Sequence, residues 1–234
     1  DLGAEMRRLV TVRDEIDEIG KGLMFLCEEC DVVITSGGLG PTHDDMTLQA
    51  VGFALGRELR EDEEALEIVK RQYKMLFRKK IVSSDEMTET RRKMAIIPIG
   101  SKALDNTVGG APGVLIEYND TTIFCLPGVP AELKDIWESS IRPWIVKNTR
   151  GSYFEEIVEF EIIDESVFAP FIQSVMQSHP SVWIKSMPKR YGTTKIMRVW
   201  ISSRGTDDTE VKQNVADALL ALERESGLTR LSDE

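Results

Sequence analysis

Hydrophobic residues along the first 146 positions follow helical and strand spacings in turn. Residues 14–28 carry apolar side chains at intervals of three and four, which predicts one buried helix face, and Asp14 is placed to cap this helix. The apolar run within 31–35 is typical of a buried strand. By the same criteria we expect strands at 6–12, 114–118 and 121–126, and helices at 46–55, 61–77, 85–95 and 130–146. Strands alternating with helices predict a layered α/β domain over residues 1–148.

A second, smaller pattern follows the segment KNTRGS (147–152), which is typical of a linker. The spacing there predicts, in order, a strand at 153–163, a helix at 165–178, strands at 181–187 and 194–203, and a helix at 207–225. This βαββα order indicates a small α+β domain over residues 152–228.

Composition narrows the possible functions. A formal net charge of −11 over 234 residues argues against sequence-independent binding of a phosphate backbone across the whole surface. No apolar run reaches the ~20 residues that span a bilayer, and no signal peptide is visible. Three cysteines (27, 30 and 125) do not make a disulfide framework, so we expect a cytoplasmic protein without membrane association, its cysteines packed.

The most informative stretch is ITSGGLGPTHDDMT (34–47). Gly37, Gly38 and Gly40 follow a predicted strand and precede a predicted helix, an arrangement that suits a phosphate or another anion. The alternative is a tight turn in which Asp44, Asp45 and Thr47 only cap the helix. Two adjacent carboxylates beside an anion site repel the anion unless a cation such as Mg²⁺ lies between them. The pair therefore favours a metal and phosphate site.

A second junction of the same kind occurs at LPGVPAELK (126–134), where Gly128 and Pro130 lie between a strand and a helix. Two such junctions in an α/β domain predict a crevice at the carboxyl ends of the strands. The glycine-rich loop 106–113 could form a third wall, and the run 91–93 is the nearest source of positive charge. The alternative for the junction at 126–134 is a plain strand-to-helix connection. The alternative for the run 91–93 is a solvated charged face.

Together, TSGGLGPTHDDMT, MTETRRKMA, NTVGGAPG and LPGVPAELK resemble the CinA family in their order and spacing. They resemble its molybdopterin-binding-type domain, which is shared with molybdenum-cofactor biosynthesis proteins and eukaryotic FAD synthases. The resemblance runs from about residue 6 to 144 and implies a three-layer α/β domain with a mostly parallel sheet. By this resemblance the chain begins after the family's first strand and helix. The tail resembles, more loosely, the KH-like domain of CinA proteins.

The resemblance also implies roles for particular residues. Asp45 matches the family's functional acid and metal ligand, with Asp44 beside it as a second catalytic candidate, and Arg92 and Lys93 match a basic pair. The implied ligand-binding positions are Gly37, Gly38, Gly40, Thr42, Thr47, Arg92, Lys93, Asn106, Gly110, Gly128 and Pro130. The chain departs from the family at Thr107, where proline is usual, and at Thr90 and Arg91, which replace a common Asn-Asn.

By the same resemblance, we expect a metal-dependent nucleotide pyrophosphatase acting on substrates such as ADP-ribose or FAD, with Mg²⁺, Co²⁺ or Ni²⁺. The alternatives are adenylyl transfer to molybdopterin, binding of a pterin or nucleotide, and a non-catalytic binding module. A homo-oligomer, dimer or trimer, is also expected.

The tail raises a separate question. Residues 166–206 contain no acidic residue but hold Trp183, Lys185, Lys189, Arg190, Tyr191, Lys195, Arg198, Trp200 and Arg204. Bases interleaved with aromatics suit single-stranded nucleic acid. The alternative, that the aromatics form core or dimer contacts and the bases are solvated, is favoured, because the GxxG loop with which KH domains clamp RNA is absent. We therefore do not expect a nucleic-acid partner.

Overall fold

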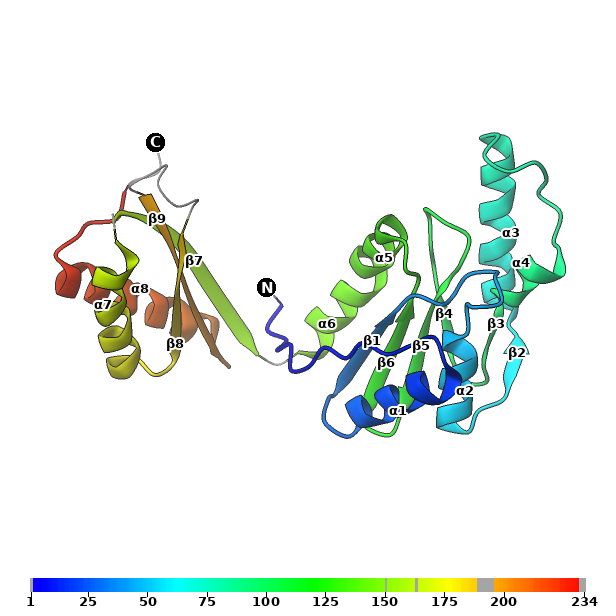
Figure 1. Ribbon diagram of the computed structural model, residues 1–234, viewed down its shortest axis with the longest axis horizontal. Coiled ribbons are helices and arrows are strands. Elements are labelled where there is room, and N and C mark those ends of the chain that lie inside the picture. Colours follow the sequence, from blue (N-terminus) through cyan, green and yellow to red (C-terminus); the bar gives the residue numbers. More distant parts are fainter. Residues whose placement is uncertain (1, 150, 163, 189–195, 232–234) are drawn as a thin grey trace. The chain divides into compact units, whose positions relative to one another are not determined.

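A computed structural model describes residues 2–149, 151–162, 164–188 and 196–231. The chain forms two compact units (Figure 1): Met6–Trp144, and the residues from Ile145 onward together with those before Met6. No helix among the described residues is long and apolar enough to cross a membrane.

The larger unit is built on a four-stranded sheet. Its strands, in spatial order, are β1 (Val32–Ser36), β6 (Thr121–Leu126), β5 (Gly113–Tyr118) and β4 (Lys102–Leu104). β1 pairs with β6 in parallel, while β6 with β5 and β5 with β4 are antiparallel. As a result the carboxyl ends of β1, β6 and β4 and the amino end of β5 meet at one edge of the sheet. A separate two-stranded ribbon pairs β2 (Leu59–Glu61) with β3 (Ile96–Pro98).

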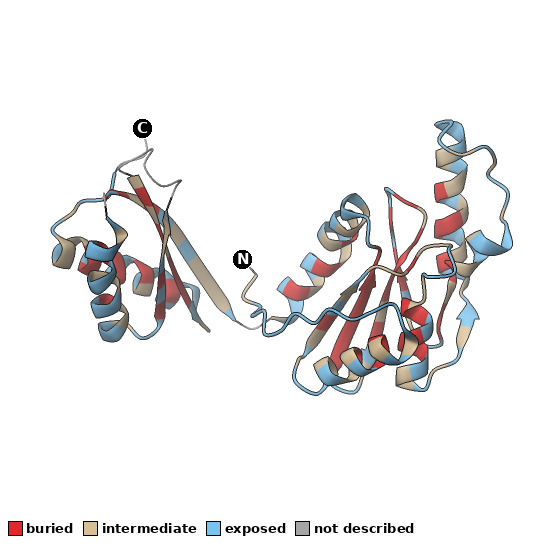
Figure 2. Ribbon diagram, in the orientation of Figure 1, coloured by how far each residue is buried: buried red, intermediate tan, exposed pale blue. Residues whose placement is uncertain are grey.

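Helices lie on both faces of this sheet (Figure 1). The helices before β5 are α1 (Ile16–Cys27), α2 (Thr47–Leu55), α3 (Glu63–Arg78) and α4 (Glu89–Lys93). After β6 come α5 (Pro130–Ile136), a π-helical turn (Trp137–Ile141) and α6 (Arg142–Asn148). Ile123 of β6 packs in one core with Leu23 and Val51, whereas its neighbour Phe124 meets Trp144 edge to face at 5.3 Å. Successive side chains of β6 therefore pack against helices on opposite faces of the sheet. Buried residues lie mainly in the strands and on the helix sides that face them (Figure 2).

The predicted α/β class is confirmed, and the sheet is mixed rather than mostly parallel. The cause is the two-residue turn at Asn119 and Asp120, which returns the chain directly and makes β5 and β6 an antiparallel hairpin. Asn119 adopts φ +50°, a conformation that asparagine tolerates in tight turns. The cysteines at 27, 30 and 125 are free thiols, and all three contribute to the core.

Three local predictions were wrong. Residues 6–12 form no strand; Arg7 and Arg8 instead tie this segment to Glu29, and its apolar side chains are largely exposed. Asp14 does not cap α1, whose N-cap residue is Glu15 without a side-chain cap bond. The helix expected at 85–95 shrinks to α4, because the Thr88 hydroxyl accepts from the Arg91 N–H and starts the helix there.

The smaller unit has the predicted βαββα order. An antiparallel sheet, ordered β7 (Ser152–Glu161), β9 (Ile196–Gly205), β8 (Val182–Pro188), packs against α7 (Glu165–Ser178) and α8 (Asp208–Ser226) (Figure 1). Phe160, Val199 and Leu222 belong to its core. Lys189, Arg190, Tyr191 and Lys195, which belong to the basic and aromatic pattern of the tail, lie outside the described residues.

Candidate functional site

The two glycine turns predicted to form a crevice touch each other. Because β1 and β6 run in parallel, both end at the same edge, where the Gly37 N–H donates to the carbonyl oxygen of Leu126 at 2.9 Å. Just beyond, a Cβ placed on Gly128 would lie 3.3 Å from the Cα of Gly37. The two turns therefore approach at a distance that leaves little room for a side chain at Gly128.

The first glycine turn is fixed by Thr47, at the start of α2. Gly37 and Gly38 adopt φ of +103° and +71°, which strongly favour glycine. The Thr47 hydroxyl donates to the Gly37 carbonyl at 2.8 Å, and the Thr47 N–H donates to the Gly38 carbonyl at 3.2 Å. A Cβ on Gly38 would lie 2.1 Å from the Thr47 hydroxyl oxygen. Both the backbone conformation and the available space thus demand glycine at position 38.

Asp45 closes the other end of the loop. Its Oδ2 accepts a hydrogen bond from the Thr42 N–H at 2.9 Å and another from the Thr42 hydroxyl, and a Cβ on Gly40 would lie 2.6 Å from the same oxygen. Burial acts to raise the pKa of Asp45, but the hydrogen bonds from Thr42 and Gly40 and the charge of Lys93 together lower this pKa below its ordinary value. Asp45 is therefore an ionised part of the loop itself.

Neither aspartate caps α2. The N-cap residue of that helix is Met46, and it carries no side-chain cap bond. Asp44 lies on the outside of the loop with its side chain 68% exposed, next to the fully exposed His43. The Thr42 hydroxyl also lowers the pKa of Asp44. The capping alternative for the two carboxylates is thus wrong, and Asp44 is the carboxylate that faces solvent.

The three basic residues at 91–93 make three different sets of contacts. Lys93 donates through its Nζ to the carbonyl oxygens of Thr42 and Asp45, so it holds the backbone of the glycine loop. Arg92 pairs with Glu61 at 3.0 Å. Arg91 stacks on the ring of Tyr73 at 3.9 Å and donates to two carbonyl oxygens of the loop that follows α3. Of the two predicted basic residues, only Lys93 contacts the glycine loop.

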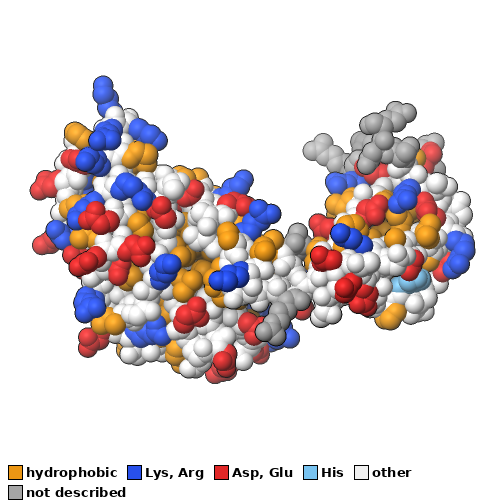
Figure 3. Space-filling view, turned by 180° about the vertical axis from the view of Figure 1, so that it is seen from behind, with side chains coloured by type: hydrophobic (Ala, Val, Ile, Leu, Met, Phe, Trp, Pro, Cys, Tyr) orange, Lys and Arg blue, Asp and Glu red, His pale blue; other side chains and the backbone are white. Residues whose placement is uncertain are grey.

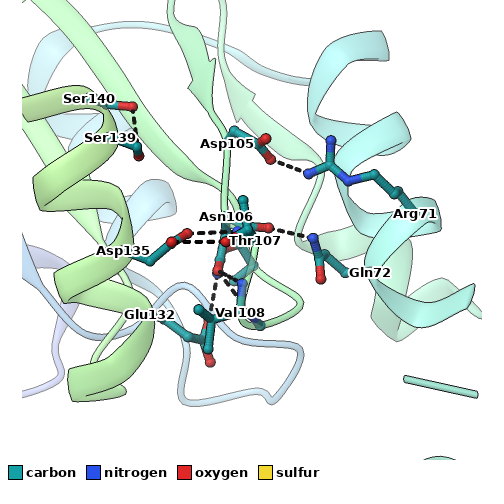
Figure 4. Close-up of polar contacts among 12 residues, drawn as sticks. Arg71, Gln72, Asp105, Asn106, Thr107, Val108, Glu132, Asp135, Ser139 and Ser140 are labelled. Carbon is teal, nitrogen blue, oxygen red and sulfur yellow. Dashed lines mark hydrogen bonds and ion pairs between the residues drawn. The ribbon is translucent and has the colours of Figure 1, made fainter. Parts of the chain in front are cut away.

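Asn106 shapes the loop 106–113, the predicted third wall of the crevice, which precedes β5 at the same sheet edge (Figure 4). Its side chain is fully buried and satisfied at both ends. The Nδ2 donates to the Ala111 carbonyl and to Glu132 Oε2, each at 2.7 Å, while Oδ1 accepts from the Val108 and Gly109 N–H groups at 3.0 and 2.8 Å. Asn106 therefore shapes this loop from within and has no bond left for a ligand.

This arrangement matches a known family. The family model described as a probable molybdopterin-binding domain matches residues 1–147. The chain belongs to this family. Protein PH0439 of Pyrococcus horikoshii is 39% identical over 193 residues, covering 82% of this chain and 74% of that protein. A protein of Aeropyrum pernix is 38% identical over 225 residues, covering 95% and 80%.

A solved structure agrees with the family. The crystal structure of CinA from Thermoplasma acidophilum, described as a protein of unknown function, is 36% identical and superimposes with a TM-score of 0.54. The match covers 60% of this chain and 78% of that one. The resemblance to CinA that the four sequence motifs indicate is therefore confirmed.

In this molybdopterin-binding-type domain, sequence reasoning missed two acidic residues of α5 (Figure 4). Glu132 reaches Asn106, and a Cβ on Gly109 would collide with the Glu132 carboxyl group. Asp135 accepts from the N–H and hydroxyl of Thr107 at 2.7 and 2.8 Å. The available signal was their position directly after the second glycine turn, where Pro130 starts the helix. Through these contacts α5, which follows the Gly128 turn, holds the loop 106–113 in place.

Two remaining features bear on ligand chemistry. Within the described residues, no three histidine, cysteine, aspartate or glutamate side chains gather as a metal site, so a metal here would need oxygen ligands from a substrate or water. Among the residues that the structure describes, the backbone N–H groups of Gly38 and Leu39 find no hydrogen-bond partner. Unpaired N–H groups in a turn with positive φ are the usual form of a backbone anion site.

Proposed function

We propose that the larger unit binds the phosphates of a nucleotide at the sheet edge where β1 and β6 end, and that it hydrolyses nucleotide pyrophosphates such as ADP-ribose or FAD. The observation that carries this proposal is the contact between the Gly37 and Gly128 turns, beside the unpaired N–H groups of Gly38 and Leu39. Backbone N–H groups at a glycine turn of this kind can bind the oxygens of a phosphate.

Each residue of the loop then has a separate task. The N–H groups of Gly38 and Leu39 bind phosphate oxygens and stabilise the negative charge that develops there. Asp45 keeps the loop closed through Oδ2 and offers Oδ1 to a divalent cation, with Asp44 as the solvent-facing neighbour. A bound divalent cation supplies charge neutralisation and a water of lowered pKa. Lys93 holds the carbonyl groups of the loop in place.

A second candidate is binding of a pterin or nucleotide, with or without adenylyl transfer, and without hydrolysis. One observation favours it: the family model that matches residues 1–147 is described as a probable molybdopterin-binding domain. Both candidates place the ligand phosphate at the same glycine turns.

Incubation of the whole chain with ADP-ribose or FAD separates these candidates. We expect release of AMP in the presence of Mg²⁺, Co²⁺ or Ni²⁺ and none after chelation by EDTA, because a cation must offset the charge of the pyrophosphate. The variant His43→Ala, whose side chain is fully exposed on the same loop, should match the wild type. Absence of AMP with every metal, together with saturable nucleotide binding, would exclude hydrolysis and leave the second candidate.

A further inference from the structure

The second half of α3 and the loop that follows it contribute no buried residue to the core. Ala65, Ile68, Val69 and Gln72 are buried and anchor the first half of the helix, whereas every side chain from 74 to 84 is half-buried or exposed. Figure 1 shows this end of α3 projecting past the sheet. We call residues 74–84 the arm.

The arm is basic in an otherwise acidic protein. The whole chain has a formal net charge of −11, but residues 68–84 include six Lys or Arg residues and no Asp or Glu. Lys70 pairs with Glu67, and Arg71 pairs with Asp105. The other four form no ion pair with any residue that the structure describes; they are Lys74, Arg78, Lys79 and Lys80. A solvated helix face normally mixes both signs of charge, so this excess favours a negatively charged partner.

Apolar side chains lie among these bases. Phe77 is 43% and Ile81 is 66% exposed. An open hollow of about 680 Å³ lies here, and it is lined by Phe77, Arg78, Lys80, Ile81, Val82 and Ser83. In Figure 3 basic and hydrophobic side chains gather over this end of α3, at the upper left. The arm therefore offers apolar surface directly beside positive charge.

Lys80 adopts a backbone conformation that glycine normally occupies. The Lys80 N–H donates to the Phe77 carbonyl oxygen and the Ile81 N–H donates to the Leu76 carbonyl oxygen, each at 2.9 Å, which ends α3 in a Schellman motif. This motif holds Lys80 at φ +59°. Glycine would be more stable there, so the lysine indicates a role for its side chain beside the hollow.

From these observations we propose that the arm binds an acidic peptide segment of another protein. One apolar side chain of that segment enters the hollow, and its carboxylates pair with the four unpaired bases. Single-stranded nucleic acid stacks its bases on several aromatic rings, whereas Phe77 is the one aromatic residue of the arm. A hollow also suits an inserted side chain better than a flat lipid surface.

Binding of the whole chain to an array of short synthetic peptides tests the charge and the anchor together. Each peptide surrounds one Phe, Leu or Ile with Asp and Glu at varied spacing, and a matched series carries Ser in place of the acids. We expect saturable binding of some acidic peptides, weakened by added salt, and none of the Ser series. No binding of any acidic peptide, or equal binding of the two series, would overturn the proposal. Binding only of single-stranded RNA or of vesicles containing phosphatidylserine would assign the arm to those partners instead.

Single substitutions then locate the peptide on the arm. Lys79→Glu should raise the dissociation constant of the best acidic peptide about tenfold or more. Lys102→Glu makes the same change of net charge at an exposed position of β4 and should leave binding unchanged. Ile81→Ser should also weaken binding, in contrast to Leu220→Ser, since Leu220 is similarly exposed but lies on α8. Equal effects within either pair would show that the peptide does not bind the arm.

Lys80→Gly separates binding from folding. This variant should raise the unfolding temperature, because φ +59° suits glycine, and yet weaken binding of the acidic peptide. Thermal unfolding followed by circular dichroism and titration of a fluorescent peptide measure the two effects. A more stable variant with unchanged peptide affinity would contradict the role assigned to the Lys80 side chain.

Discussion

Replacing Gly38 by alanine is expected to lower the free energy of unfolding by about 2–3 kcal/mol and to abolish nucleotide binding. The φ of +71° costs a residue with a Cβ about 1–2 kcal/mol. The new methyl group would also displace the Thr47 hydroxyl and break its hydrogen bond to Gly37, a loss of about 1 kcal/mol. Urea unfolding and equilibrium binding of ADP-ribose measure the two effects.

Gly56→Ala is the matched control for this substitution. Gly56 adopts φ +63°, but a Cβ there would meet nothing within 4 Å, so only the backbone strain is shared. We expect a loss of about 1–2 kcal/mol and unchanged nucleotide binding for this control. In addition, Gly38→Ala should cost less in a Thr47→Ala background, since the hydroxyl oxygen that the new methyl group would meet at 2.1 Å is then absent. Equal losses for Gly38→Ala and Gly56→Ala would show that the contact with Thr47 has no energetic role.

The second large effect concerns Asp45. Asp45→Asn keeps a carbonyl oxygen that can accept from Thr42, so the loop should keep its conformation while it loses the negative charge. We expect kcat/KM for ADP-ribose to fall about a hundredfold or more, because a cation that stabilises the pyrophosphate is then held poorly. Initial rates over a range of metal concentration would show the loss as a raised metal requirement.

Asp44→Asn is the paired variant in this experiment. The Asp44 side chain is mostly exposed and outside the loop, so we expect a loss of less than about tenfold. If the two variants lose activity equally, the two carboxylates act as one unit. If only Asp44→Asn is inactive, the metal role assigned to Asp45 is wrong.

The glycine turns could be predicted from the sequence because their cause is local. Three glycines after an apolar run indicate a turn with positive φ, and Gly37 and Gly38 adopt that conformation. By contrast β2, β3 and β4 have three residues each, too few to show a strand period. The apolar run at 6–12 suggests a strand, but a strand needs a partner, and the tie to Glu29 holds this segment elsewhere.

For the site, what could be predicted from the sequence is limited by contacts between residues that lie far apart along the chain. Glu132 reaches Asn106 across 26 positions, and Lys93 reaches Thr42 across 51. The resemblance implies that Lys93 binds the ligand, whereas its Nζ contacts the carbonyl oxygens of the glycine loop. No periodicity in the sequence reports such contacts. The contact between Glu132 and Asn106, for example, depends on the register of β4, β5 and β6, which brings the ends of β4 and β6 to one sheet edge.

The most direct test of the proposed phosphate site is a crystal structure of the whole chain with ADP-ribose and Mg²⁺. We predict phosphate oxygens within hydrogen-bond distance of the Gly38 and Leu39 N–H groups, next to the Gly128 turn, with the metal between phosphate and Asp45. A nucleotide bound with its phosphates away from the Gly37–Gly40 loop would contradict the account.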